Sequence, residues 1–254
     1  CELPYDVLSS SEARAAAAGH PLSFFHVSKP EIDLPEGTDP YSDEVYAKGA
    51  ENFQNLLSQG ALYQDEKPCY YLYRQIMGDH SQTGLVAAAS CQEYLDEVIK
   101  KHEFTRPDKE NDRVKHIESL NAQTGPVFLT YRSQPELDRV FKGQSDKEAC
   151  VDITAPDGVR HTAWTINDAI VIKQIESAFD NISTLYIADG HHRSAAAGRI
   201  FQSRNGEGNS GGFLTVVFPH DQMQILAYNR AVKDLNGRRP EEILSTLEGL
   251  GTVE

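Results

Sequence analysis

The residues best suited to chemistry in this sequence follow a short apolar segment. Residues 184–188 (TLYIA) are typical of a buried strand and run directly into DGHHR, residues 189–193, and then into an alanine-rich helix. Free N–H groups and the dipole at the start of such a helix favour an anion, which arginine and protonated histidine bind further. The expected phosphate-binding residues are therefore Asp189, Gly190, His191, His192 and Arg193.

A second group of reactive side chains lies earlier in the chain, in KHEFTRPDK, residues 101–109. Here Glu103 follows His102 and stands just before a helix that begins at Pro107, a favoured first helical position. A carboxylate in this place can act as a general base or as a metal ligand. On the helix, cationic residues at i, i+4 and i+7 form one stripe. With the entry residue Arg106, the cationic binding residues expected here are Arg106, Lys109, Arg113 and His116.

Both groups are islands of positive charge in an acidic chain. The 254 residues include 24 Lys and Arg against 38 Asp and Glu, a net charge of −14. A chain this acidic is repelled by a phosphate backbone, so we expect no nucleic-acid partner. We expect the islands instead to enclose one site for a small anion, with Glu103 and His192 within about 15 Å of each other, which leaves room for a substrate.

Each group also has a plainer interpretation. The DGHHR segment could be a surface turn, and the charged helix a solvated face. A third alternative is a metal-dependent hydrolase built on His102, Glu103, His116 and His191. A zinc site from the pair His191 and His192 is disfavoured, because adjacent histidines rarely point the same way and no third ligand is near in the sequence. Asp108 and Asp112, four residues apart, are suited to Mg²⁺ or to a pair of bases.

Composition indicates a globular chain with 39% hydrophobic and 24% charged residues. Apolar runs fall far short of the roughly 20 residues of a membrane-spanning helix, so we expect no membrane association and a cytoplasmic location. The four cysteines are widely spaced, which favours reduced thiols over a disulfide framework or a zinc site. Because the sequence starts without Met, we expect a fragment of a longer protein.

The elements expected around the site mix helices with β-hairpins, which indicates an α+β fold in a single domain, 1–254. Strands are expected at 23–28 and 127–131, and as hairpins at 69–77 with 82–90, on either side of the turn 155–158, and at 213–218 with 223–230. Helices are expected at 9–19, 41–58, 91–99, 105–120, 135–142, 167–179, 191–204 and 240–250, and a flexible loop at 205–212 (NGEGNSGG).

Over its whole length the sequence resembles the domain of unknown function 1015 family. The segments that carry the resemblance are LPYDV (3–7), PEIDLPEGTD (30–39), YRQIM (73–77), QTGLVA (82–87), IKKHEFTRPDKENDR (99–113), TGPVFLTY (124–131), YIADGHHR (186–193) and YNRAVKDLNG (228–237).

The DGHHR segment and its helix are also similar to the phosphate-binding motif of the ParB/sulfiredoxin-like superfamily, which includes partition-protein CTPases, sulfiredoxin and free-serine kinases. The catalytic cysteine of sulfiredoxin is absent, and the acidic chain does not suit the DNA-binding helices of a partition protein. The resemblance therefore implies a ParB/sulfiredoxin-like core and a small-molecule phosphotransferase like the free-serine kinases.

Such an enzyme would use ATP or ADP with Mg²⁺ and a small-molecule substrate, with no tightly bound metal. Its catalytic residues would be Glu103 as the base, beside His102, with Asp6 as the second candidate for the base. The alternative from a different class is a regulatory module that binds a nucleotide without turnover.

Overall fold

The computed structural model describes residues 2, 5, 7–227 and 232–252, and it divides into two compact units, Cys1–Met223 and Gln224–Glu254. The second unit contains helix α9 (Pro240–Glu248), none of whose described residues is buried. The expectation of a single domain over 1–254 stays a prediction. Within the described residues, no helix has the length and apolar character that crossing a bilayer requires.

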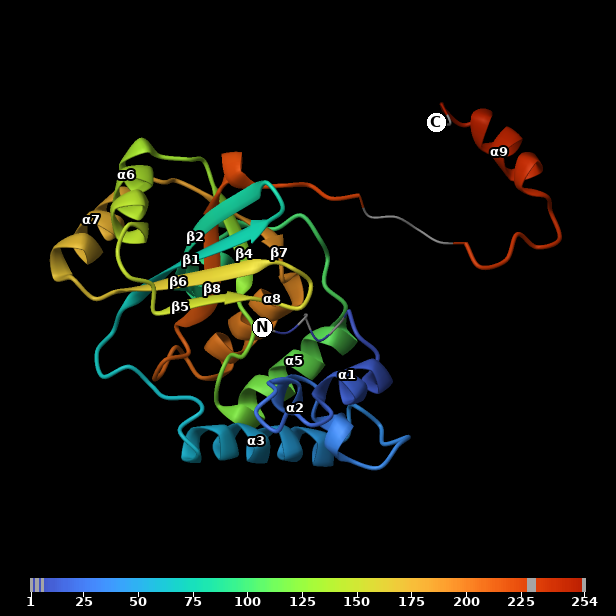
Figure 1. Cartoon of the computed structure of the whole chain (residues 1–254), viewed down its shortest axis with the longest axis horizontal. Coiled ribbons are helices and arrows are strands. Elements are labelled where there is room, and N and C mark those ends of the chain that lie inside the picture. The colour runs from blue at the N-terminus through green and yellow to red at the C-terminus, as the bar shows by residue number, and fades with distance from the viewer. Residues whose placement is uncertain (1, 3–4, 6, 228–231, 253–254) are drawn as a thin grey trace. The chain divides into compact units, whose positions relative to one another are not determined.

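A mixed sheet of eight strands organises the first unit (Figure 1). Its order is β3-β7-β4-β8-β2-β1-β6-β5, with β3/β7 and β4/β8 parallel and the other neighbours antiparallel. The strands are β1 (Tyr70–Met77), β2 (His80–Ser90), β3 (Ile99–Lys100), β4 (Val127–Tyr131), β5 (Val151–Thr154), β6 (Arg160–Ile166), β7 (Leu185–Asp189) and β8 (Gly212–Pro219). The α+β expectation is confirmed, whereas a ParB/sulfiredoxin-like core stays a prediction.

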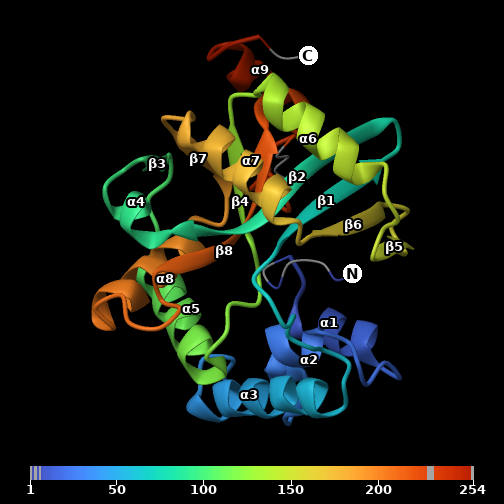
Figure 2. The ribbon, with the colours of Figure 1, turned by 90° about the vertical axis from the view of Figure 1, so that its left-hand side faces the viewer.

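Helices α6 (Pro135–Ser145) and α7 (Ala169–Asp180) cover one face of the sheet (Figures 1 and 2). Their apolar side chains enter the main core with strand residues such as Leu72 and Trp164. Helix α4 (Cys91–Leu95) joins β2 to β3, and helices α5 (Pro107–Leu120) and α8 (His191–Ser203) pack against each other.

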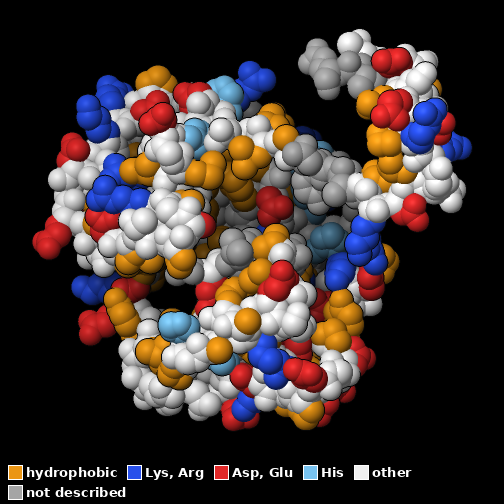
Figure 3. Space-filling view, turned by 45° about the vertical axis from the view of Figure 1, so that its right-hand side comes forward, with side chains coloured by type: hydrophobic (Ala, Val, Ile, Leu, Met, Phe, Trp, Pro, Cys, Tyr) orange, Lys and Arg blue, Asp and Glu red, His pale blue; other side chains and the backbone are white. Residues whose placement is uncertain are grey.

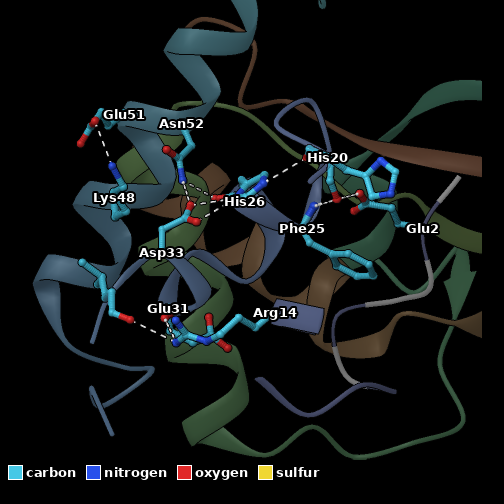
Figure 4. Close-up of polar contacts among 12 residues, drawn as sticks. Glu2, Arg14, His20, Phe25, His26, Glu31, Asp33, Lys48, Glu51 and Asn52 are labelled. Carbon is cyan, nitrogen blue, oxygen red and sulfur yellow. Dashed lines mark hydrogen bonds and ion pairs between the residues drawn. The ribbon is translucent and has the colours of Figure 1, made fainter. Parts of the chain in front are cut away.

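The N-terminal part of the first unit is helical and consists of α1 (Ser10–Ala17), α2 (Phe25–Ser28), the 3-10 helix η1 (Pro30–Asp33) and α3 (Asp43–Ser58). Polar side chains tie these elements together, as Figure 4 shows. The His26 ring bonds Asp33, and the Asn52 amide donates to both the Asp33 carboxylate and the His26 carbonyl. These bonds hold η1 and α2 against α3.

The strand expected at 23–28 is wrong, because this segment forms α2. Alternate residues of a strand share one face, whereas in a helical turn they point in different directions. Phe25 accordingly packs with Ala13 and Ile32, while Val27 packs in a different cluster with Leu56. The apolar side chains of this segment are therefore buried in two separate clusters and do not line one face of a sheet.

The hairpin expected from 213–218 and 223–230 is also wrong. Strand β8 is central, with β2 on one side and β4 on the other, so both of its edges are filled. Residues 220–222 form a 3-10 turn, and 223–227 form no strand; 228–230 lie outside the described residues. The β1/β2 and β5/β6 hairpins and the long helices are confirmed. The helix expected at 91–99 ends at Leu95, because Ile99 pairs with β7 as part of β3. The loop expected at 205–212 consists of hydrogen-bonded turns leading into β8.

Candidate functional site

The two chemistry-bearing segments meet because the strands that precede them are parallel neighbours. Ile99 pairs with Leu185 and Lys100 with Tyr186. The carboxyl ends of parallel strands lie at the same edge of a sheet, so the segments that leave β3 and β7 emerge side by side. Three contacts described below join these segments, which places Glu103 and the DGHHR residues in one site.

Gly190 makes the tight turn between β7 and α8. Its φ of +95° lies in the left-handed region, and a Cβ here would meet the Arg193 guanidinium and the Val127 Cα at 3.3 Å. Farther along α8, a Cβ on Gly198 would meet the Tyr94 ring at 3.2 Å, and Ala196 is fully buried. The small residues therefore let α8 pack closely.

His191, the first residue of α8, is the buried centre of the site and is only 5% exposed. Its Nδ1 lies 3.5 Å from Glu103 Oε2, and its ring meets the His102 ring edge-on at 4.5 Å between centroids. Burial lowers the pKa of His191, and the nearby His102 lowers it further. Among the described residues, the buried Nε2 has no hydrogen-bond partner. A largely neutral imidazole thus stands beside a carboxylate that is 62% exposed.

The next two residues of α8 bind neighbouring loops. The His192 Nε2 accepts the Arg106 backbone N–H at 3.1 Å, which joins the two segments directly. The Arg193 guanidinium donates to the Pro126 carbonyl and to Asp189 Oδ2, the latter at 2.7 Å. In this structure Arg193 is therefore paired with a carboxylate, and an incoming anion would have to compete with Asp189.

Sequence reasoning missed the role of Pro126, which contributes its carbonyl from the loop before β4. The signal was present in Gly125-Pro126, a dipeptide typical of a tight loop. The Arg193 side chain packs against this loop, since a Cβ on Gly125 would meet Arg193 Cδ at 3.5 Å, an ordinary van der Waals distance.

Helices α5 and α8 run parallel, so their N-terminal ends lie at the same side. Arg106 contacts His192 at their starts, and Arg204 bonds Asn121 just beyond their ends. The amides of His191, His192 and Arg193 have no acceptor in the described structure, and the first turn of α8 carries no acid. By contrast, α5 has Asp108 in its first turn, and Arg106 pairs with this carboxylate at 2.7 Å. Of these two helix N-termini, the one with free N–H groups and no neighbouring carboxylate in its first turn is that of α8.

The rest of the expected cationic stripe has contacts elsewhere. Lys109 donates to the Tyr41 hydroxyl at 2.8 Å, and Arg113 is buried against Asp112 and the Tyr5 ring. His116 donates to the Val27 carbonyl at 3.0 Å. The structure therefore does not bring Arg113 and His116 together with His191. Asp6 lies outside the described residues.

His116 provides a test of this structural role. Burial lowers its pKa from 6.5 to about 4, and the Arg113 charge acts in the same direction. The folded protein keeps the ring neutral, while the unfolded chain takes up a proton near pH 6.5, so stability falls as the pH drops through this window. Between pH 7 and pH 5 we expect a loss of about 2 kcal/mol from this residue, measured by urea unfolding. The loss should disappear in His116→Gln and persist in the exposed-histidine control His20→Gln.

A metal-dependent hydrolase built on all four expected ligands is not supported by this arrangement. His102, Glu103 and His191 lie together, but His116 bonds Val27 in the helical part. Within the described chain, no three His, Cys, Asp or Glu side chains are placed to hold a metal ion. On the face drawn in Figure 3, Lys and Arg are interspersed with Asp and Glu rather than gathered in one broad basic patch.

Comparison with known proteins bears on family membership alone. No curated protein and no solved structure matches the chain. The similarity of the DGHHR segment to the ParB/sulfiredoxin-like superfamily therefore stays a hypothesis. A family model matches residues 1–254, so the chain belongs to the family described as "Protein of unknown function (DUF1015)".

Proposed function

We propose that the protein is a small-molecule phosphotransferase that binds the phosphates of ATP or ADP at the start of α8. The observation that carries the proposal is the contact between Glu103 and His191 at a helix end whose amides have no acceptor in the described structure. This arrangement combines a cradle for an anion with an exposed carboxylate next to it. Phosphoryl transfer needs those two functions, positioning of phosphate and acceptance of a proton.

In the proposed reaction the amides of 191–193 hold phosphate oxygens, and Arg193 exchanges Asp189 for phosphate. The substrate hydroxyl gives its proton to Glu103 as its oxygen bonds to the transferred phosphorus. The bond from that phosphorus to the nucleotide oxygen breaks, and the nucleotide leaves with those electrons. The buried His191 ring lies beside the Glu103 carboxylate, with Nδ1 3.5 Å from Oε2, and would orient it toward the substrate hydroxyl.

Mg²⁺ would supply charge neutralisation of the phosphates when bound. It usually keeps several waters and needs only one or two protein carboxylates besides the phosphate oxygens, so a cluster of three ligands is not required. Asp189, with a side chain 71% exposed at the end of β7, fits that role.

The direct test is mass balance. The protein is incubated with ATP or ADP, Mg²⁺ and a panel of small hydroxyl compounds, and products are followed by mass spectrometry and ³¹P NMR. We expect a phosphorylated compound in proportion to the nucleotide consumed. Saturable nucleotide binding with no phosphorylated product would instead favour the regulatory module, and the absence of nucleotide binding would overturn both interpretations.

Arg193→Ala should weaken binding of pyrophosphate and of ADP by about 1.5–3 kcal/mol, the range for hydrogen bonds to charged groups. Isothermal titration calorimetry measures the effect, and Arg132→Ala, which removes an exposed arginine just beyond β4, is the matched control. Because Arg193 also bonds the Pro126 carbonyl, circular dichroism must first show that the variant is folded. Unchanged affinity in a folded variant would contradict the phosphate role of Arg193.

A further inference from the structure

A cavity lies at the C-terminal ends of α5 and α8, away from the candidate site around His191. Its volume is about 370 Å³, near the lower end of the roughly 300–1,000 Å³ typical of small-molecule sites. The lining residues used below are Ile117 and Asn121 at the end of α5, Ile200 and Arg204 at the end of α8, and Glu207 in the turn that follows. Helix α8 has 13 residues and is about 20 Å long. This cavity is therefore separate from the candidate site around His191 at the start of α8, called the His191 site below.

The cavity has a negative electrostatic character at one wall. Two parallel helices end there, and a helix C-terminus carries a partial negative charge. Neither helix has a basic residue in its last turn, and the cation beside these ends is Arg204, the C-cap residue of α8 described below. Glu207 adds a full carboxylate for which the described structure shows no ion-pair partner. These groups favour an ammonium ion.

Arg204 provides the opposite charge at the same cavity. Its guanidinium donates to Asn121 Oδ1 at 3.1 Å, which fixes the side chain across the two helix ends and leaves other N–H donors available. Arg204 and Glu207 form no ion pair with each other in the described structure, although both line the cavity. The two charges are therefore separated, with Ile117 and Ile200 supplying an apolar wall.

We propose that this cavity binds a small zwitterion with an aliphatic group. Its ammonium group lies toward Glu207 and the helix ends, its carboxylate accepts hydrogen bonds from Arg204, and its aliphatic part packs on Ile117 and Ile200. The proposal is independent of the function of the His191 site.

The experiment uses three probes of matched shape on the full chain: L-leucine, 3-methylbutylamine and 4-methylpentanoate. Calorimetric titration at low salt, up to about 10 mM probe, should show one saturable leucine site per chain. Each singly charged probe should bind at least tenfold more weakly. Glu207→Gln should abolish the preference for leucine over 4-methylpentanoate, and Arg204→Gln the preference for leucine over the amine.

Because these are ratios of affinities within one variant, a modest loss of stability does not change their meaning. Glu148→Gln and Arg132→Gln make the same charge changes at exposed positions outside the cavity and should leave both preferences intact. No saturable leucine binding would overturn the proposal. Equal binding of leucine and the amine would do so as well, since Arg204 would then not contact the ligand.

Discussion

Glu103→Gln is expected to lower kcat for phosphoryl transfer by about 10²–10⁴, the usual effect of removing a general base, and to leave nucleotide affinity nearly unchanged. The amide keeps the size of the side chain and can still lie beside His191, but it cannot take the hydroxyl proton. Since Glu103 is exposed and its contact with His191 is long, at 3.5 Å, the substitution should affect folding little. Single-turnover kinetics with the substrate identified by mass balance measures the effect.

The matched control is Glu118→Gln, the same change at an exposed position on α5 near its far end. It should retain the kcat of the unaltered protein. Asp6→Asn tests the second candidate for the base. If Glu103→Gln keeps full turnover while Asp6→Asn loses it, the base has been misassigned, although the phosphate site would remain.

The local parts of the site could be predicted from the sequence because they depend on neighbouring residues. A buried strand followed by Asp189-Gly190 and an alanine-rich helix defines its own turn, and Gly190 has the positive φ that this turn requires. The meeting of Glu103 with His191 depends on the pairing of β3 with β7, which is a long-range contact. Periodicity did not show that pairing. The expectation that Glu103 lies near the DGHHR segment came from the hypothesis of a single anion site, which stays a prediction.

The assignment of Arg113 and His116 shows where helical periodicity reaches its limit. Spacing of i, i+4 and i+7 identifies residues that share a helix face, but it does not say which neighbour that face meets. Helix α5 packs against both α8 and α3. The face bearing Arg113 and His116 meets the N-terminal part of the chain, where the Tyr5 ring contacts Arg113 and the Val27 carbonyl accepts from His116. The charge of Arg113 is balanced by Asp112, its neighbour on the same helix. The β8 pairing was missed for the same reason, since both of its partners lie far away in the chain.

Asp112→Ala should therefore reduce the free energy of unfolding by about 3–5 kcal/mol, the cost of removing one partner of a buried ion pair. The Asp112 carboxylate accepts the Tyr46 hydroxyl at 2.8 Å and two bonds from Arg113, and both charged side chains are at least 90% buried. Without the carboxylate, the guanidinium stays buried with the Tyr5 ring as its remaining described contact.

Asp108→Ala is the matched control, because Asp108 lies one turn earlier on the same helix and pairs with Arg106 in an exposed setting. Exposed pairs contribute little, so urea unfolding should show a much smaller change for this variant. Pyrophosphate titration of Arg113→Met then separates structure from binding. If Arg113 only stabilises the fold, we expect the same pyrophosphate affinity as in the unaltered protein. A loss of affinity as large as that in Arg193→Ala would show that Arg113 belongs to the anion site.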